Sequence, residues 1–166
     1  VAEADSQNNS DRLKKAFTNG FLLCFFLGCF LFISILISKP LLKFLGQPQI
    51  IVDLAIPYLD IVSFSLIPLL MFQALKQYSD GLSMTSYSMY ATIFANLINI
   101  LINYVLIFGK FGFPQLGIIG AAIGTLVSRI MMFIVLYTLL KKNKIIKNIT
   151  KGFFLINKKI FKNIIS

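Results

Sequence analysis

Four polar side chains recur along one apolar stretch of this 166-residue chain, and their types and spacing suit them to bind a solute or an ion. They are Thr92, Asn96, Asn99 and Asn103, at successive spacings of four, three and four residues. This spacing places all four on one face of a helix. An amide group in hydrocarbon is costly unless it is hydrogen-bonded. The stripe therefore either joins helices or lines a path for a substrate or cation, and we favour the path because one interhelical contact would need fewer residues.

Two side chains of opposite charge also lie within apolar stretches. Asp60 and Arg129 are each unfavourable near the centre of a bilayer unless they are paired or hydrated. We hypothesise that they form an intramembrane ion pair, in which Arg129 extends toward Asp60 along the membrane normal. The alternative is that each side chain reaches a headgroup region separately.

The remaining reactive side chains do not form a catalytic or metal-binding set. Cys24 and Cys29 lie inside an apolar stretch, and the chain contains no histidine. A free cysteine in such surroundings packs as a small apolar residue. Because no nucleophile and base pair or ligand cluster is visible, we expect no enzymatic activity, no catalytic residues, no metal site and no cofactor.

The elements that carry these residues are membrane-spanning helices. Hydrophobic residues make up 57% of the chain, more than the roughly 45–50% of a soluble domain. Several stretches reach the about 20 apolar residues that a span requires, and none alternates as a barrel strand does. We therefore predict an all-α fold, a polytopic transmembrane helical bundle. Its predicted spans are residues 16–38, 54–75, 84–108 and 116–140.

Two of these spans contain residues that shape the backbone or the packing. In the second span, Pro68 removes a backbone hydrogen bond, so we predict a kink there. In the fourth span, Gly120 and Gly124 are four residues apart, and small residues at this spacing let a second helix approach closely.

The basic residues predict the orientation in the membrane. If residues 1–15, the turn at Lys76 and the segment 141–166 share one side, that side carries twelve basic residues, against three on the other. The positive-inside rule then puts both ends of the chain in the cytoplasm, with the spans in the inner (plasma) membrane. We predict that residues 1–15 form a cytoplasmic loop.

The segment 141–166 contains eight lysines and no acidic residue. We interpret it as a basic cytoplasmic amphipathic segment, which is either solvated or bound to the anionic surface of the lipid bilayer. Nucleic-acid binding is not expected, because no stacking aromatic groove or recognition motif accompanies the lysines. The chain begins at Val1 rather than at a methionine, and we expect it to be a piece of a longer chain with further helices.

Two runs of sequence resemble the multidrug and toxic compound extrusion (MATE) family. They are SLIPLLMFQALKQYSDGLSMTSYSMY at residues 65–90 and NLINILINYVLIFGKFGFPQLGIIGAAIGTLVSR at residues 96–129. The resemblance implies that the four spans are similar to helices three to six of the N-terminal lobe in a twelve-helix, two-lobe transporter. It also implies alternating access, with drugs or organic cations exported in exchange for Na⁺ or H⁺.

The same resemblance bears on the polar stripe. Asn99 and Asn103 match positions that line the N-lobe cavity of the family. Some members have an acidic residue at the position of Asn103, whereas this chain has an amide, which does not titrate in the physiological range.

Two other functions stay open. One is a flippase for lipid-linked oligosaccharides from a related superfamily, although such a protein is expected to offer several basic residues to a pyrophosphate and only Arg129 is available here. The other is a membrane scaffold subunit that does not transport. The polar stripe disfavours the scaffold.

Overall fold

The computed structural model describes residues 10–44, 46 and 48–142 of the chain. Within these residues all regular structure is helical, which confirms the all-α fold. The helices are α2 (Ser10–Ser38), α3 (Leu41–Phe44), α4 (Gln49–Phe64), α5 (Leu66–Gly81), α6 (Thr85–Phe108) and α7 (Gly117–Lys142). Residues 1–9 of the predicted cytoplasmic loop and residues 143–166 of the predicted basic segment lie outside the described residues.

Four stretches of the described chain are long and apolar enough to cross a membrane: Phe17–Ser38, Gln49–Gly81, Thr85–Phe108 and Gly117–Lys142. The second is longer at both ends than the predicted 54–75, because the helix continues into polar sequence. At its first turn, Gln49 donates from Nε2 to Asp53 Oδ1 over 3.1 Å, a contact that hydropathy does not register. The protein is thus a multi-pass membrane protein.

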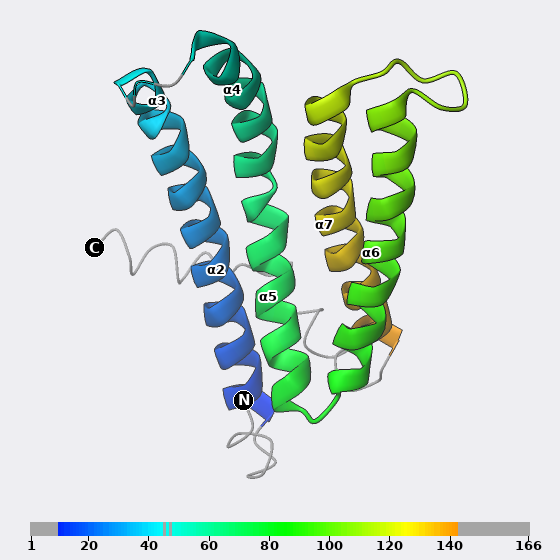
Figure 1. Ribbon diagram of the computed structural model, residues 1–166. Coiled ribbons are helices and arrows are strands. Elements are labelled where there is room, and N and C mark those ends of the chain that lie inside the picture. The colour runs from blue at the N-terminus through cyan, green and yellow to red at the C-terminus, as the bar shows by residue number, and fades with distance from the viewer. Residues whose placement is uncertain (1–9, 45, 47, 143–166) are drawn as a thin grey trace.

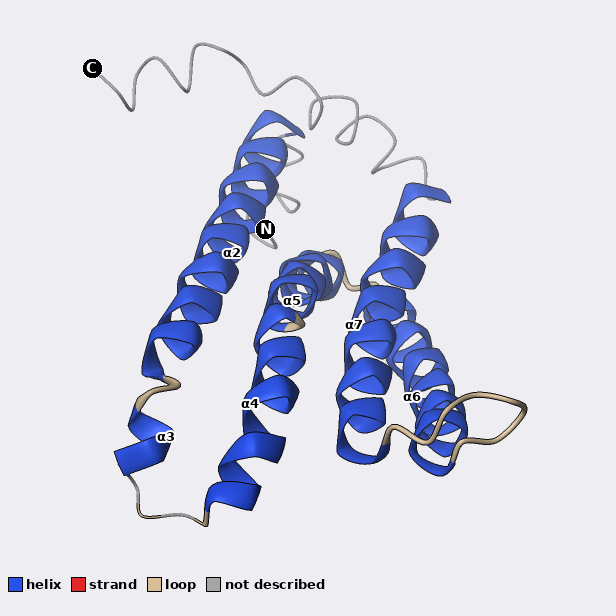
Figure 2. Cartoon of the chain, turned by 90° about the horizontal axis from the view of Figure 1, so that it is seen from above, coloured by secondary structure: helices blue, strands red, loops and turns tan. Residues whose placement is uncertain are grey.

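The second stretch contains one residue that is not helical, Ser65, which separates α4 from α5. Pro68 follows three residues later, and its nitrogen has no hydrogen to donate to the carbonyl of Phe64. The interruption therefore lies at the turn that the proline disturbs, not at Pro68 itself. Figure 2 shows that α4 and α5 run in different directions on either side of it.

The four membrane-spanning stretches alternate in direction and pack around α7. Helix α7 contacts α4, α5 and α6, and α2 contacts α4 and α5. In Figure 1 the turn between α5 and α6 and the end of α7 lie at one end of the bundle, and α3 and the loop between α6 and α7 lie at the other. Lys76 and Lys141 thus share one end and Lys39 and Lys110 the opposite end, which is the arrangement that the orientation argument assumes.

The main apolar core lies where α2, α5 and α7 meet. Phe17 and Tyr78 pack with their ring centroids 4.6 Å apart, and Leu136 and Leu140 of α7 are almost fully buried against this group. This core fixes α7 against α5, and so holds the first half of α7 in place beside α4 and α6.

Helices α6 and α7 approach each other closely at the two glycines of the predicted small-residue motif. A β-carbon added at Gly120 would lie 2.8 Å from the carbonyl carbon of Leu106, and one added at Gly124 would collide with the side-chain oxygen of Asn103. The close packing predicted from the spacing of these glycines is confirmed. As a result, polar groups of α6 come within hydrogen-bonding distance of α7.

Candidate functional site

A chain of hydrogen bonds joins α6 to α7 at the middle of the two spans. Asn103 donates from Nδ2 to Asn99 Oδ1 over 3.0 Å, and Asn99 donates from Nδ2 to Ser128 Oγ of α7 over 3.3 Å. Ser128 in turn donates to the backbone carbonyl of Thr125 over 2.9 Å. We call Asn99, Asn103 and Ser128 the polar seam. Of these bonds, the one between Asn99 and Ser128 crosses from α6 to α7, and the close approach of the helices at Gly124 brings the two side chains within reach.

The seam ends in an oxygen atom that has no hydrogen-bond partner within the described chain. Asn103 Oδ1 is buried and faces the backbone of α7 at Gly124. An amide carbonyl has two lone pairs, and neither is used by a hydrogen bond within the described residues. Buried acceptors without a partner are uncommon and energetically costly, which makes this atom the most distinctive feature of the seam.

The other two members of the predicted stripe do not join the seam. Thr92 donates its hydroxyl to the carbonyl of Ser88 in its own helix over 2.8 Å, and Asn96 is exposed. All four side chains still share one face of α6, as their spacing predicts. The half of the stripe nearest the end of α6 therefore contacts α7, while Asn96 remains accessible from outside the described bundle. That the stripe lines a transport path stays a prediction.

The hypothesised ion pair between Asp60 and Arg129 needs correction, because the structure gives each residue another partner. Asp60 forms an ion pair with Lys39, which follows the end of α2. Arg129 donates from Nη1 to Ser65 Oγ. The physical reason is the packing order: α2 contacts α4 near Asp60, whereas α7 meets the second span at the interruption between α4 and α5.

Arg129 is therefore a side chain that links α7 to the interrupted span. Its acceptor, Ser65, is fully buried and donates its own hydroxyl to the carbonyl of Val62 over 2.6 Å. Since Ser128 and Arg129 are adjacent, one turn of α7 contacts both the seam on α6 and the break in the second span.

Sequence reasoning missed Ser65 and Lys39 as partners. Ser65 carries a recoverable signal, because a serine three residues before a proline in a span offers a hydroxyl to a backbone that has lost a hydrogen bond. Lys39 directly follows an apolar stretch, and a long side chain at a span end reaches neighbouring helices.

The groups of the seam limit what it can do chemically. Amides and a hydroxyl neither titrate nor act as nucleophiles without an adjacent base. They can donate to and accept from a polar solute, and their oxygens suit a hard cation. Within the described residues no group of three or more His, Cys, Asp or Glu side chains could hold a metal ion. The chemistry that these groups offer is therefore the donation and acceptance of hydrogen bonds.

Comparison with known proteins agrees with this description. The family model described as MatE matches residues 1–105. A probable multidrug resistance protein NorM from Rhizobium meliloti is 32% identical over 76% of this chain and 27% of its own length. A second probable NorM, from Photorhabdus laumondii, is 31% identical over 86% of this chain and 32% of its own length.

A third relative gives the same result. A probable multidrug resistance protein YoeA from Bacillus subtilis is 30% identical over 87% of this chain and 31% of its own length. The chain spans about a third or less of each of these relatives. Since the family model covers more than half of the chain and the relatives cover most of it, the chain belongs to the MATE family.

Proposed function

We propose that the complete protein is a multidrug efflux transporter and that this chain supplies part of its translocation path. The supporting observation is the polar seam, whose Asn103 Oδ1 is buried between two membrane-spanning helices and has no hydrogen-bond partner among the described residues. A helix pair that served packing alone would satisfy this oxygen or replace it with an apolar group. The relatives, named as multidrug resistance proteins, support the same assignment.

The finer mechanism that we propose is cation-coupled antiport. Drugs or organic cations leave the cell by alternating access, and Na⁺ or H⁺ enters in exchange. The free lone pairs of Asn103 Oδ1 suit a cation or a donor group of the substrate. Because neither seam amide titrates, protons would have to be carried by groups other than Asn99 and Asn103. We place the transporter in the inner (plasma) membrane, with both ends of this chain in the cytoplasm.

The charged groups of the site do not support the alternative function of a lipid-linked oligosaccharide flippase. A pyrophosphate would need free cationic groups, yet Arg129, a basic side chain in the middle of α7, is bonded to Ser65 at the helix interruption. Lys39 is likewise engaged, by Asp60. We therefore do not propose this function.

The test is ethidium efflux from bacteria that lack their own pumps and carry the complete parent gene. The double variant Asn99→Ala, Asn103→Ala is compared with the wild type at equal membrane expression. Thr138→Ala is the control, because Thr138 is an exposed residue of α7 whose hydroxyl donates to Val135 in its own helix. We expect efflux by the wild type and by the control, and its loss in the double variant. Efflux that persists in the double variant would reduce the seam to packing, and a well-expressed wild type without efflux of any of a panel of cationic dyes would favour the scaffold.

Coupling is tested in proteoliposomes that contain the complete protein. An inward Na⁺ gradient and an inward H⁺ gradient are imposed separately, and dye movement is recorded. Acceleration by either gradient supports antiport and identifies the ion, whereas dye movement that ignores both gradients contradicts it.

A further inference from the structure

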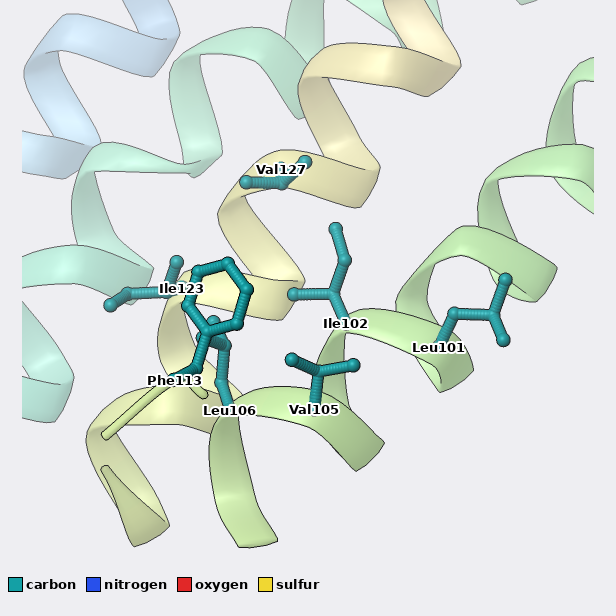
Figure 3. A pocket seen from close by; sticks show the side chains of 7 residues that line it. All are labelled: Leu101, Ile102, Val105, Leu106, Phe113, Ile123 and Val127. Atoms are coloured by element: carbon teal, nitrogen blue, oxygen red, sulfur yellow. The ribbon is translucent and has the colours of Figure 1, made fainter. Parts of the chain in front are cut away.

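A cavity lies between α6 and α7, near the end of the bundle that carries their connecting loop. It has a volume of about 290 Å³ and is lined only by apolar side chains. The lining residues are Leu101, Ile102, Val105, Leu106, Phe113, Ile123 and Val127. Figure 3 shows the ring of Phe113, from the loop, between Ile123 of α7 and Ile102 of α6. We call it the apolar cavity.

The apolar cavity lies beside the polar seam on the same helix pair, since Ile123 and Val127 directly precede Gly124 and Ser128. Leu101 follows Asn99 by two residues, and Val105 follows Asn103 by two. Residues two apart on a helix point in nearly opposite directions around its axis. Leu101 and Val105 therefore point away from the two asparagines, toward the outer side of α6.

The cavity adjoins an exposed apolar stripe on α6. Leu97, Leu101, Tyr104 and Phe108 are each more than half exposed, and they repeat at spacings of four, three and four residues. In a membrane-spanning helix, large apolar side chains of this kind face hydrocarbon. A hydrophobic ligand from the bilayer can thus enter the cavity sideways without crossing a polar surface.

A basic side chain sits where this stripe ends. Lys110 follows the last residues of α6 and is exposed, and its backbone is bonded to two lining residues of the cavity: its N–H donates to Val105 over 3.0 Å and its carbonyl accepts from Phe113 over 3.2 Å. The end of a span is the level of the lipid headgroups, where a lysine attracts a phosphate.

We propose that the apolar cavity binds part of an acyl chain of an anionic phospholipid, whose phosphate lies at Lys110. The volume is just below the roughly 300–1,000 Å³ of small-molecule sites. A wholly apolar lining would leave the polar groups of a drug unsatisfied, but it suits a hydrocarbon chain. The charge of Lys110 at the headgroup level selects an anionic lipid over a zwitterionic one. This site is independent of the proposed transport function.

The proposal is tested on the complete protein, purified and delipidated in detergent. The midpoint of thermal unfolding is followed as dioleoylphosphatidylglycerol or dioleoylphosphatidylcholine is added. A ligand that binds only the folded state raises this midpoint. For the wild type we expect a shift of several degrees with the anionic lipid and a clearly smaller one with the zwitterionic lipid.

Three variants locate the site. Ile123→Phe places a larger side chain inside the cavity and should clearly reduce the shift given by the anionic lipid, and Lys110→Gln should reduce it to the level of the zwitterionic lipid. Ile100→Phe is the matched control: it makes the same change at an exposed position of α6 that does not line the cavity, so its shift should equal that of the wild type.

The proposal is overturned if both lipids shift the wild type equally, or if Ile123→Phe responds like the wild type. The second result would mean that another helix of the complete protein covers the cavity. Should Ile123→Phe fail to accumulate, Lys110→Gln decides the question, because an exposed loop substitution leaves folding intact: an unchanged preference for the anionic lipid in this variant contradicts the site.

Discussion

Gly124 of α7 and Asn103 of α6 are in direct contact, and no side chain at Gly124 is compatible with the observed position of Asn103 Oδ1. The absence of a side chain at Gly124 thus leaves room for the side chain of Asn103. It allows the helices to approach until the Asn103 amide lies between them, and this approach also brings Asn99 to within 3.3 Å of Ser128. The close approach of α6 to α7 and the hydrogen bonds of the polar seam therefore depend on each other.

This contact predicts the effect of one added methyl group. Gly124→Ala should destabilise the protein by about 1–3 kcal/mol, the usual cost of overpacking a tight interface. The measurement is the thermal unfolding midpoint of the complete protein in detergent. Gly20→Ala is the control, because a β-carbon at Gly20 meets nothing within 4 Å, and it should cause no loss.

A double variant shows whether the side chain of Asn103 causes the loss of stability in Gly124→Ala. Asn103→Ala removes the obstructing oxygen, so Gly124→Ala should cost much less in that background than in the wild type. Equal costs in both backgrounds would assign the strain to the backbone of α6 instead.

The bond between Arg129 and Ser65 predicts that two buried serines differ in importance. Ser63 and Ser65 both donate to a carbonyl three residues earlier in α4, but Ser65 also accepts from Arg129. Ser65→Ala leaves a guanidinium unpaired, at a cost of about 1–3 kcal/mol. Ser63→Ala loses only its local bond and should be nearly neutral. Similar unfolding midpoints for the two variants would show that Arg129 finds another partner.

The partner of Asp60 is tested by double-mutant cycles of unfolding free energy. Lys39→Gln and Asp60→Asn should be non-additive, with a coupling of up to about 1 kcal/mol, because Asp60 is 44% exposed and partly screened. Arg129→Gln and Asp60→Asn should be additive, since the structure does not join them. Coupling in the second cycle and additivity in the first would restore the pair that the sequence suggested.

Hydropathy and spacing predict most of the fold, because each property is local. A run of apolar residues specifies a span, the 4, 3, 4 spacing specifies a shared helix face, and Gly120 with Gly124 specifies a close approach. None of these signals says which helices are neighbours. The choice between Lys39 and Arg129 as the partner of Asp60 depends on this neighbourhood, and opposite charge alone could not decide it.

The same limit applies to the site. The polar stripe on α6 could be predicted from the sequence. Which of its asparagines contact α7 could not, because that depends on how α7 packs across α6. Asn99 and Asn103 contact α7 and Asn96 does not. Pro68 likewise predicts that the second span is interrupted, but not at which residue. The interruption lies at Ser65, whose hydroxyl donates to Val62 and accepts from Arg129.

The bond between Asn99 and Ser128 separates a transport path from a packing contact. Asn99→Ala removes this bond and the one that Asn99 accepts from Asn103, and Ser128→Ala removes this bond and the one that Ser128 donates to Thr125. Each variant thus loses two hydrogen bonds, and we expect a similar loss of stability in both, roughly 0.6–2 kcal/mol per interhelical bond. Only Asn99→Ala also removes an amide from the stripe. If the stripe lines the path, ethidium efflux at equal expression should fall much further in Asn99→Ala than in Ser128→Ala. If the bond serves packing alone, the two variants should lose efflux in proportion to their loss of stability, and Thr92→Val, whose hydroxyl is bonded within its own helix, should lose neither.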